Sequence, residues 1–245
     1  MLDILRTLTF GATAGTLFAA VLNSLPIRPG SRLALGAGIG SWIALVVALT
    51  GSGVVAGKPF VLPLLFVLPL VAAGFAATSA TVRSAMMAIP ASLIIALNAM
   101  RVLGVFMLLA ALAGTMSGPF PYSASIGDII TGLFALPIAR LAAQNPRDVR
   151  VLEWNIFGAL DLIAAVTLGI LSANGSPLQL IHAGVGATAM TTLPWALIPL
   201  VLVPTFLMGH ALVFAHVRAA AIAGTPPRLV WHKHRRLMSE ARHCL

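Results

Sequence analysis

The feature that most constrains this chain is a series of long apolar segments separated by short polar ones. A helix needs about 20 predominantly apolar residues to cross the hydrocarbon core of a bilayer. We predict seven such spans, at residues 4–25, 33–50, 59–80, 91–116, 126–141, 151–171 and 193–217. The sequence therefore predicts an all-α polytopic membrane protein, a seven-transmembrane-helix bundle that forms a single domain over residues 1–217, followed by a basic tail over residues 218–245.

The composition supports lipid as the solvent of this chain. Of its 245 residues, 59% are hydrophobic and 9% are charged, whereas soluble domains carry about 25% charged residues. The net charge of +9 comes from basic residues that lie mostly outside the apolar segments. In a membrane protein such charges first indicate topology, so we expect no nucleic-acid partner. No Walker loop, GxGxxG, GxSxG or HExxH motif occurs, which argues against nucleotide-driven transport.

The distribution of basic residues predicts an orientation. With seven spans and a cytoplasmic C-terminus, the N-terminus lies outside. The cytoplasmic loops and tail then carry twelve basic residues: Arg28, Arg32, Arg83, Arg140, Arg147, Arg150, Arg218, Arg228, Lys233, Arg235, Arg236 and Arg242. The outer side carries only Arg6 and Lys58. This bias follows the positive-inside rule, and we expect a multi-pass protein of the inner (plasma) membrane.

The two ends of the chain and one loop carry further expectations. The start, MLDILRTLTF, lacks the Lys/Arg-rich beginning of a cleaved signal, so we expect the first span to be retained. The tail segment RLVWHKHRRLM mixes basic and apolar residues, which predicts a short amphipathic helix on anionic lipid. The mildly apolar loop 174–192 is compatible with either an interfacial or a re-entrant segment.

Small residues recur at every fourth position in the first two spans. Gly11 and Gly15 lie on one such stripe, and Gly36 and Gly40 on another. Small residues allow neighbouring membrane helices to approach closely. We therefore expect these stripes to pack against other helices of the chain, or to form the surface that meets a membrane-protein partner or a second copy of the chain.

Six polar side chains interrupt the apolar segments of the second half of the chain. They are Asn98, Arg101, Asp128, Asn155, Asp161 and His210. Ionisable groups in hydrocarbon are costly and by default indicate function, so these six are the candidates for substrate binding or proton handling. At 1.5 Å per residue, Arg101 and Asp161 each lie about 15 Å from the inner end of their span, which predicts an ion pair near the bilayer midplane.

Two interpretations of this pair remain open. In the first, Arg101 and Asp161 only tie two helices together. In the second, they line a polar cavity in which Arg101 binds an anionic or carbonyl group and Asp161 or His210 handles a proton. Gly158 shares a helix face with Asp161, which turns that carboxylate toward a closely packed helix or a narrow cavity. Asp128, at the start of span 126–141, is expected to cap that helix, with an outer gate or cation ligand as the alternative.

No cofactor is required by the sequence. The single cysteine, Cys244, forms neither an internal disulfide nor a metal-ligand set. His210 is compatible with a proton carrier, an ordinary hydrogen-bonding residue, or a ligand to haem or metal. Three function classes follow: a carrier of a small solute or proton, a structural or accessory subunit of a larger membrane complex, and a membrane-embedded redox enzyme or haem/metal-binding subunit that uses His210.

Overall fold

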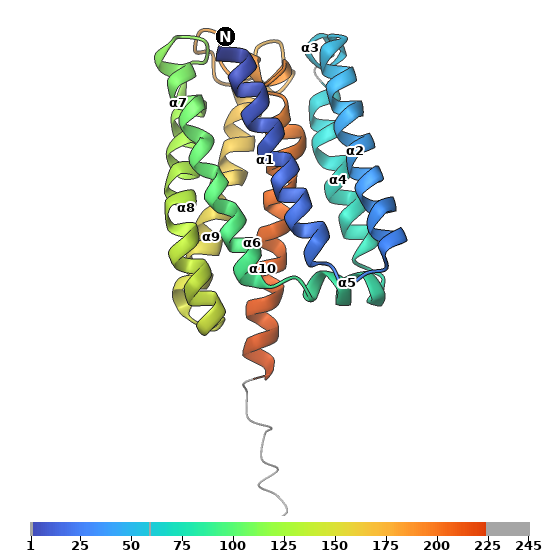
Figure 1. Cartoon of the computed structure of the whole chain (residues 1–245). Coiled ribbons are helices and arrows are strands. Elements are labelled where there is room, and N and C mark those ends of the chain that lie inside the picture. The colour runs from blue at the N-terminus through green and yellow to red at the C-terminus, as the bar shows by residue number, and fades with distance from the viewer. Residues whose placement is uncertain (1, 59, 224–245) are drawn as a thin grey trace, which may run out of the picture.

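The computed structural model describes residues 2–58 and 60–223, and this part of the chain consists of helices and their connections, without a strand (Figure 1). The predicted amphipathic helix in the basic tail lies outside the described residues. The helices are α1 (Leu2–Ser24), α2 (Pro29–Gly51), α3 (Val54–Gly57), α4 (Val61–Ala76), α5 (Ala80–Met87), α6 (Ala91–Leu97), η1 (Asn98–Gly104), α7 (Val105–Leu112), α8 (Pro119–Gln144), α9 (Val149–Leu171), η2 (Thr188–Thr191), η3 (Ile198–Leu202) and α10 (Val203–Ala223).

Several of these helices are both long and apolar enough to cross a membrane. Five qualify among the described residues: Pro29–Gly51, Ala91–Leu112, Pro119–Gln144, Val149–Leu171 and Ile198–Ile222. The pair α4–α5 makes a sixth if it counts as one broken span, because α5 is bent by 105° from α4. The chain is therefore a multi-pass helical membrane protein. The predicted span 59–80 ends as a regular helix at Ala76, and the segment that follows becomes α5 at one end of the bundle (Figure 1).

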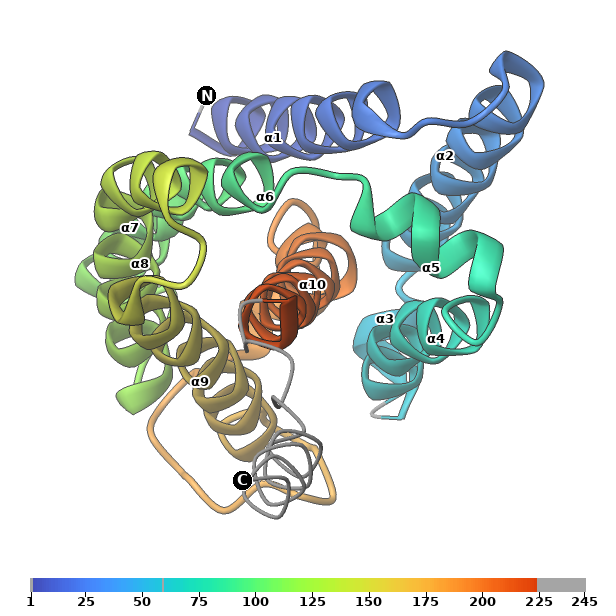
Figure 2. The ribbon, with the colours of Figure 1, turned by 90° about the horizontal axis from the view of Figure 1, so that it is seen from below.

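The long helices lie side by side around α10. Viewed along the bundle, α6, α7, α8 and α9 form a curved wall on one side of α10, while α2 and α4 lie on the other side (Figure 2). The loop that precedes η3 lies at the same end of the bundle as the start of α1 (Figure 1). The α1–α2 connection, α5 and the α8–α9 connection lie at the opposite end.

The helix that carries Asp128 begins earlier than the sequence suggested. Helix α8 begins at Pro119, so the prolines at positions 119 and 121 lie in its first turn. The backbone N–H groups of a first turn have no partner within the helix, so proline costs no hydrogen bond there. Asp128 is therefore an interior residue of α8, and the prediction that it caps a helix N-terminus is wrong.

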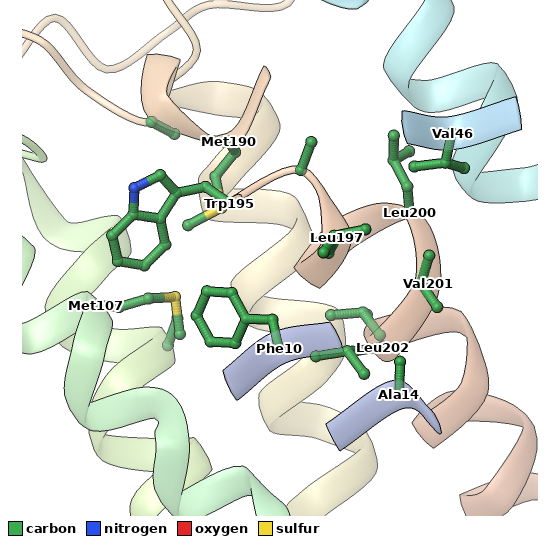
Figure 3. Packing of buried hydrophobic residues seen from close by; sticks show 14 of the residues in the cluster. Phe10, Ala14, Val46, Met107, Met190, Trp195, Leu197, Leu200, Val201 and Leu202 are labelled. Carbon is green, nitrogen blue, oxygen red and sulfur yellow. The ribbon is translucent and has the colours of Figure 1, made fainter. Parts of the chain in front are cut away.

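A buried cluster of apolar side chains lies in the half of the bundle where α1 begins. Figure 3 shows Phe10 of α1 beside Met107 of α7 and Trp195 of the segment before η3. The rings of Phe10 and Trp195 have centroids 5.8 Å apart. Trp195 is only 5% exposed. An interfacial anchor, the usual interpretation of a tryptophan near a span end, is therefore wrong for Trp195, which is part of the core.

The close packing expected through the first glycine stripes is largely missing within the chain. A side-chain carbon added at Gly11, Gly15 or Gly40 would meet nothing within 4 Å. Only Gly36 has a close neighbour, because a carbon added there would lie 3.5 Å from Leu22. The glycines that permit close helix approach lie instead in η1, α8 and α9, where the polar residues gather.

The turn between α8 and α9 carries an exposed ion pair. Asp148 precedes α9 and accepts a hydrogen bond from the backbone N–H of Arg150 at 3.0 Å, so it caps this helix. The Arg150 side chain also donates to the Asp148 carboxylate, at 2.9 Å. The hydrogen bond from the Arg150 side chain lowers the pKa of Asp148 to about 2. This carboxylate is therefore ionised at any physiological pH.

Candidate functional site

The candidate site begins with an interruption of the helix Ala91–Leu112. Seven residues in the middle of this span, Asn98–Gly104, form a tighter 3-10 helix with Arg101 at the centre. A 3-10 stretch inside a longer helix often marks a hinge or a functional position. Gly104 allows α8 to approach, because a side-chain carbon added there would lie 2.7 Å from the Asp128 Cβ. The interruption therefore places Arg101 against α8.

Arg101 binds carboxylates from two different helices. Its Nε donates to Asp128 Oδ1 at 2.6 Å, and its Nη2 donates to Asp161 Oδ2 at 2.5 Å. Its Nη1 donates to the backbone carbonyl of Gly158 at 3.2 Å. The exposed fractions of the side chains are 1% for Arg101, 16% for Asp128 and 8% for Asp161. The predicted ion pair between Arg101 and Asp161 is confirmed, and Asp128 is a second partner that was not predicted.

His210 joins the same cluster through both of its ring nitrogens. Its Nε2 lies 3.1 Å from Arg101 Nη1 and its Nδ1 lies 2.8 Å from Asn155 Oδ1. A guanidinium has donors only, so Nε2 accepts, and Nδ1 donates to the amide oxygen. Asn155 completes the contact by donating from Nδ2 to the His210 backbone carbonyl at 3.1 Å. These partners define a neutral imidazole with its hydrogen on Nδ1.

These contacts engage both of the ring nitrogens that His210 would use to bind haem iron or another metal ion. A ligand nitrogen would become free only after the contact with Arg101 or Asn155 was broken. Within residues 2–58 and 60–223, no group of three or more His, Cys, Asp or Glu side chains is arranged to hold a metal ion. The geometry thus places His210 in a hydrogen-bonded chain that runs from Asn155 through the imidazole to Arg101.

Aromatic side chains enclose the cluster. The rings of Trp154 and His210 have centroids 5.4 Å apart, and Trp154 Nε1 donates to the Thr131 carbonyl at 3.1 Å. The Phe206 ring lies beside Arg101, with its centroid 5.9 Å from Arg101 Cζ, within range of a cation–π contact. Trp154 is 7% exposed, so it belongs to the protein interior, although a tryptophan near a span end usually anchors the helix at the membrane interface. The position of Trp154 next to Asn155 in the sequence does not by itself predict that Trp154 packs against His210.

Two glycines make room for the cluster. A side-chain carbon at Gly127 of α8 would overlap the carboxylate of Asp161, and one at Gly158 of α9 would lie 2.6 Å from His210 Cε1. Asp161 therefore faces a closely packed helix, as the small-residue stripe of the span 151–171 predicted. The contribution of Gly127 was not predicted, since a single glycine in an apolar run does not indicate its neighbour.

The cluster lies near the middle of the membrane-spanning helices. Arg101 lies ten residues after Ala91 and eleven before Leu112, the ends of its span. His210 lies twelve residues after Ile198 and twelve before Ile222. At 1.5 Å per residue these positions are about 15–18 Å from either end of the helix.

Asn98 is not brought to the cluster, although it is a buried neighbour of Arg101 in sequence. Its Nδ2 donates to the Ile94 carbonyl, one turn earlier, at 3.0 Å. Its Oδ1 is buried without a hydrogen-bond partner. Asn98 instead lines a second, apolar cavity. Five of the six predicted residues therefore meet in one network, and Asn98 does not.

A small cavity adjoins the charged groups. It has a volume of about 30 Å³ and is lined by Arg101, Asp128 and apolar side chains that include Phe10, Leu162 and Phe206. A buried water requires about 10–15 Å³ of such volume and a few polar partners. The cavity therefore has room for about two water molecules beside Arg101 and Asp128, and no larger solute fits there in this conformation.

The fold and the cluster together define a multi-pass helical membrane protein with a buried polar centre. Its family is the one described as Domain of unknown function (DUF8737), which matches residues 59–218, and the chain belongs to this family. The matched range contains the whole network of Arg101, Asp128, Asn155, Asp161 and His210. No curated protein matches the chain. No solved structure matches it either.

Proposed function

We propose that this chain is a proton-handling membrane protein of the carrier class, in which the central cluster binds and releases one proton. The observation that carries the proposal is the ratio of charges at the site, where one arginine meets two aspartates. The ion pairs at 2.6 Å and 2.5 Å leave neither Asp128 nor Asp161 with a second cationic partner among the described residues.

The charges of the cluster do not balance unless one group takes up a proton. His210 is neutral by its contacts, so one positive and two negative charges leave one uncompensated negative charge. An uncompensated buried charge costs several kcal/mol, and more so within a membrane. Two carboxylates that share a site relieve this cost when one of them is protonated. The cluster is therefore suited to hold one proton, shared between Asp128 and Asp161.

The interruption of the helix that carries Arg101 supports the assignment to the carrier class. Arg101 lies on the 3-10 segment η1, which interrupts the span Ala91–Leu112 near its middle. Broken helices near the midplane are typical of secondary transporters, where the backbone changes conformation around a bound ion or solute. Loss or gain of a proton at the cluster would alter the ion pairs that hold η1 against α8 and α9.

We propose that the chain crosses the inner membrane seven times, with the N-terminus outside and the C-terminus in the cytoplasm. Helix α1 has 23 residues and lies along the bundle, which supports its inclusion with the apolar helices (Figure 1). The α1–α2 connection with Arg28, the short helix α5 with Arg83 and the α8–α9 turn with Arg147 all lie at one end of the bundle (Figure 1). A common basic end is what the positive-inside rule requires of cytoplasmic loops.

A second candidate function is that of an accessory subunit in a larger membrane complex. The observation that favours it is the open space beside Gly11, Gly15 and Gly40, where the chain itself supplies no neighbour within 4 Å. Small residues on a membrane helix permit close packing with another protein. Purification in mild detergent distinguishes the two, because an accessory subunit co-purifies with its partner in fixed proportion and a carrier that acts alone does not.

The proposal is tested by the charge that moves when a proton binds. The protein is reconstituted into vesicles on a solid-supported membrane, and the solution is switched rapidly between two pH values. We expect a transient current in the wild type, because the proton enters a site near the midplane. Asp161→Asn removes one carboxylate and should abolish this current. Glu153→Gln, an exposed position two turns away on α9, is the matched control and should leave it unchanged. A wild type without current, or an unchanged current in Asp161→Asn, would contradict the proposal.

A further inference from the structure

A second, much larger cavity separates the first part of the bundle from α10. Its volume is about 720 Å³, within the range of about 300–1,000 Å³ that is typical of sites for small molecules. The walls come from α1, α2, α4 and α5 on one side and from α6, η3 and α10 on the other. Phe18, Gly38, Ala73, Met86 and Leu212 are representative of its lining. Its lining includes none of Arg101, Asp128, Asn155, Asp161 and His210, and Phe206 is the residue that it shares with the small cavity beside Arg101.

The lining of this cavity offers almost no polar group to a ligand. The Thr205 hydroxyl donates to the Val201 carbonyl of its own helix at 2.7 Å. Trp42 Nε1 donates to the Leu200 carbonyl at 3.2 Å. The amide nitrogen of Asn98 is engaged in the same way, and its oxygen is enclosed. An occupant that suits these walls is apolar along its length.

The length of the cavity corresponds to one leaflet of a bilayer. Along η3 and α10 its lining runs from Leu200 to Leu212, which is twelve residues. At 1.5 Å per residue this is about 18 Å, a little more than half of the 30 Å hydrocarbon thickness. At the far end, near the middle of α2, the lining includes Trp42 and Leu200, which are joined by a hydrogen bond. A single extended hydrocarbon chain from one leaflet has this reach.

The other end of the cavity reaches the basic end of the bundle. Leu25, Val82 and Met86 line it there, beside the α1–α2 connection and α5 (Figure 1). Seen from below, α5 lies at that end beside α2 and α4, and the chain continues from it to α6 (Figure 2). The connection and α5 carry Arg28 and Arg83, so the mouth of an apolar cavity is placed next to cationic side chains.

Arginines contact the rim of the cavity directly. Arg32 Nη2 donates to the carbonyl of Leu25, a lining residue, at 3.0 Å, while Arg32 Nε is buried and has no hydrogen-bond partner. Arg83 Nη1 lies 3.4 Å from the carbonyl of Ala77, the residue that follows the lining residue Ala76. Among the described residues, neither arginine forms an ion pair with a carboxylate. Each therefore keeps a positive charge available to an anionic ligand.

We propose that this cavity is a binding site for one acyl chain of an anionic phospholipid, whose phosphate is held at the rim by Arg32 and Arg83. The apolar walls and the length of about 18 Å suit a lipid acyl chain. The two arginines without a carboxylate partner suit a negatively charged headgroup. Arginine is the side chain best suited to bind phosphate, because its planar donors match the phosphate oxygens. The site takes lipid from the leaflet on the basic side of the protein.

The test uses reconstitution and recovery of bound lipid. The full chain is placed in vesicles of equal parts phosphatidylglycerol and phosphatidylcholine, extracted into mild detergent, and the retained phospholipid is identified by mass spectrometry. We expect about one phospholipid per chain, with phosphatidylglycerol enriched several-fold over its share in the vesicle. Gly38→Phe should abolish retention, because its side chain enters the cavity through open space. Gly40→Phe is the matched control on the same helix, since its added carbon also meets nothing within 4 Å and Gly40 does not line the cavity.

A second variant tests whether the arginines at the rim select an anionic headgroup. Arg32→Gln combined with Arg83→Gln should leave one lipid bound but remove the preference for phosphatidylglycerol, whereas Arg147→Gln at the distant α8–α9 turn should change nothing. Equal retention in Gly38→Phe and Gly40→Phe, or a wild type that retains no phospholipid, would overturn the site. An unchanged preference in the double arginine variant would overturn the anionic headgroup. None of these measurements depends on proton binding at Asp128 or Asp161, so the two proposals fail separately.

Discussion

Replacing Arg101 with methionine is expected to lower the free energy of unfolding by about 3–5 kcal/mol, the range found when one partner of a buried ion pair is removed. The change leaves Asp128 and Asp161 facing each other without their shared cation, and it also removes the hydrogen bonds to Gly158 and His210. Unfolding in mixed micelles of rising denaturing-detergent content measures the loss. Arg147→Met, at an exposed position, is the control and should change stability by less than about 0.5 kcal/mol.

A triple variant separates lost charge balance from lost packing. Combining Arg101→Met with Asp128→Asn and Asp161→Asn removes every formal charge from the cluster while keeping side chains of similar size. We expect it to recover more than half of the stability lost in Arg101→Met, because buried ion networks are often replaceable by neutral groups at little cost. A single variant as stable as the wild type would contradict the description of Arg101 as the centre of the network.

Gly127→Ala is expected to destabilise the protein by about 1–3 kcal/mol, the usual cost of overfilling a packed site. The added carbon would overlap the carboxylate of Asp161, so α8 and α9 must separate or the ion pair with Arg101 must break. The same unfolding measurement gives the magnitude. Gly40→Ala on α2 is the control, and it should raise the free energy of unfolding. Its added carbon meets nothing within 4 Å, and alanine is the better helix former by about 0.5–1 kcal/mol. Equal effects at the two positions would contradict the close approach at Gly127.

The parts of the fold that follow from hydropathy could be predicted from the sequence. The span 151–171 differs from α9 by two residues at its start, and the pairing of Arg101 with Asp161 followed from equal depth on two helices. Both depend on local quantities, namely the length of an apolar run and a count of residues along a helix. These quantities do not depend on which helices are neighbours.

The parts that depend on tertiary contacts could not be predicted. Asp128 was expected at a helix end because its span was predicted to begin at residue 126, yet α8 begins at Pro119, since proline is suited to a first helical turn. Its true role required knowledge that α8 packs against η1. Likewise, Trp154 and Gly127 acquire their roles only when α8, α9 and α10 come together around His210. Nothing in their local sequence distinguishes them from an interfacial anchor or an ordinary small residue.

The two interpretations of the cluster predict different behaviour of the same carboxylates. A cluster that only ties helices together needs one carboxylate for one arginine. The second aspartate then adds a buried negative charge without benefit to stability. A cluster that handles a proton needs this second group, since one carboxyl holds the proton while the other stays paired with Arg101. The presence of both Asp128 and Asp161 at 2.6 Å and 2.5 Å from the guanidinium therefore favours proton binding.

The most direct test is infrared spectroscopy of the protonated carboxyl group, recorded on the full chain in lipid nanodiscs at neutral pH. We expect one protonated aspartic acid per chain, shared between Asp128 and Asp161. Its C=O stretch should disappear in Asp161→Asn and in Asp128→Asn, because the remaining carboxylate then balances Arg101, and it should persist in Glu153→Gln. A wild-type spectrum without a protonated carboxyl, at every pH at which the protein stays folded, would show that the cluster carries its excess charge unneutralised and would contradict the account.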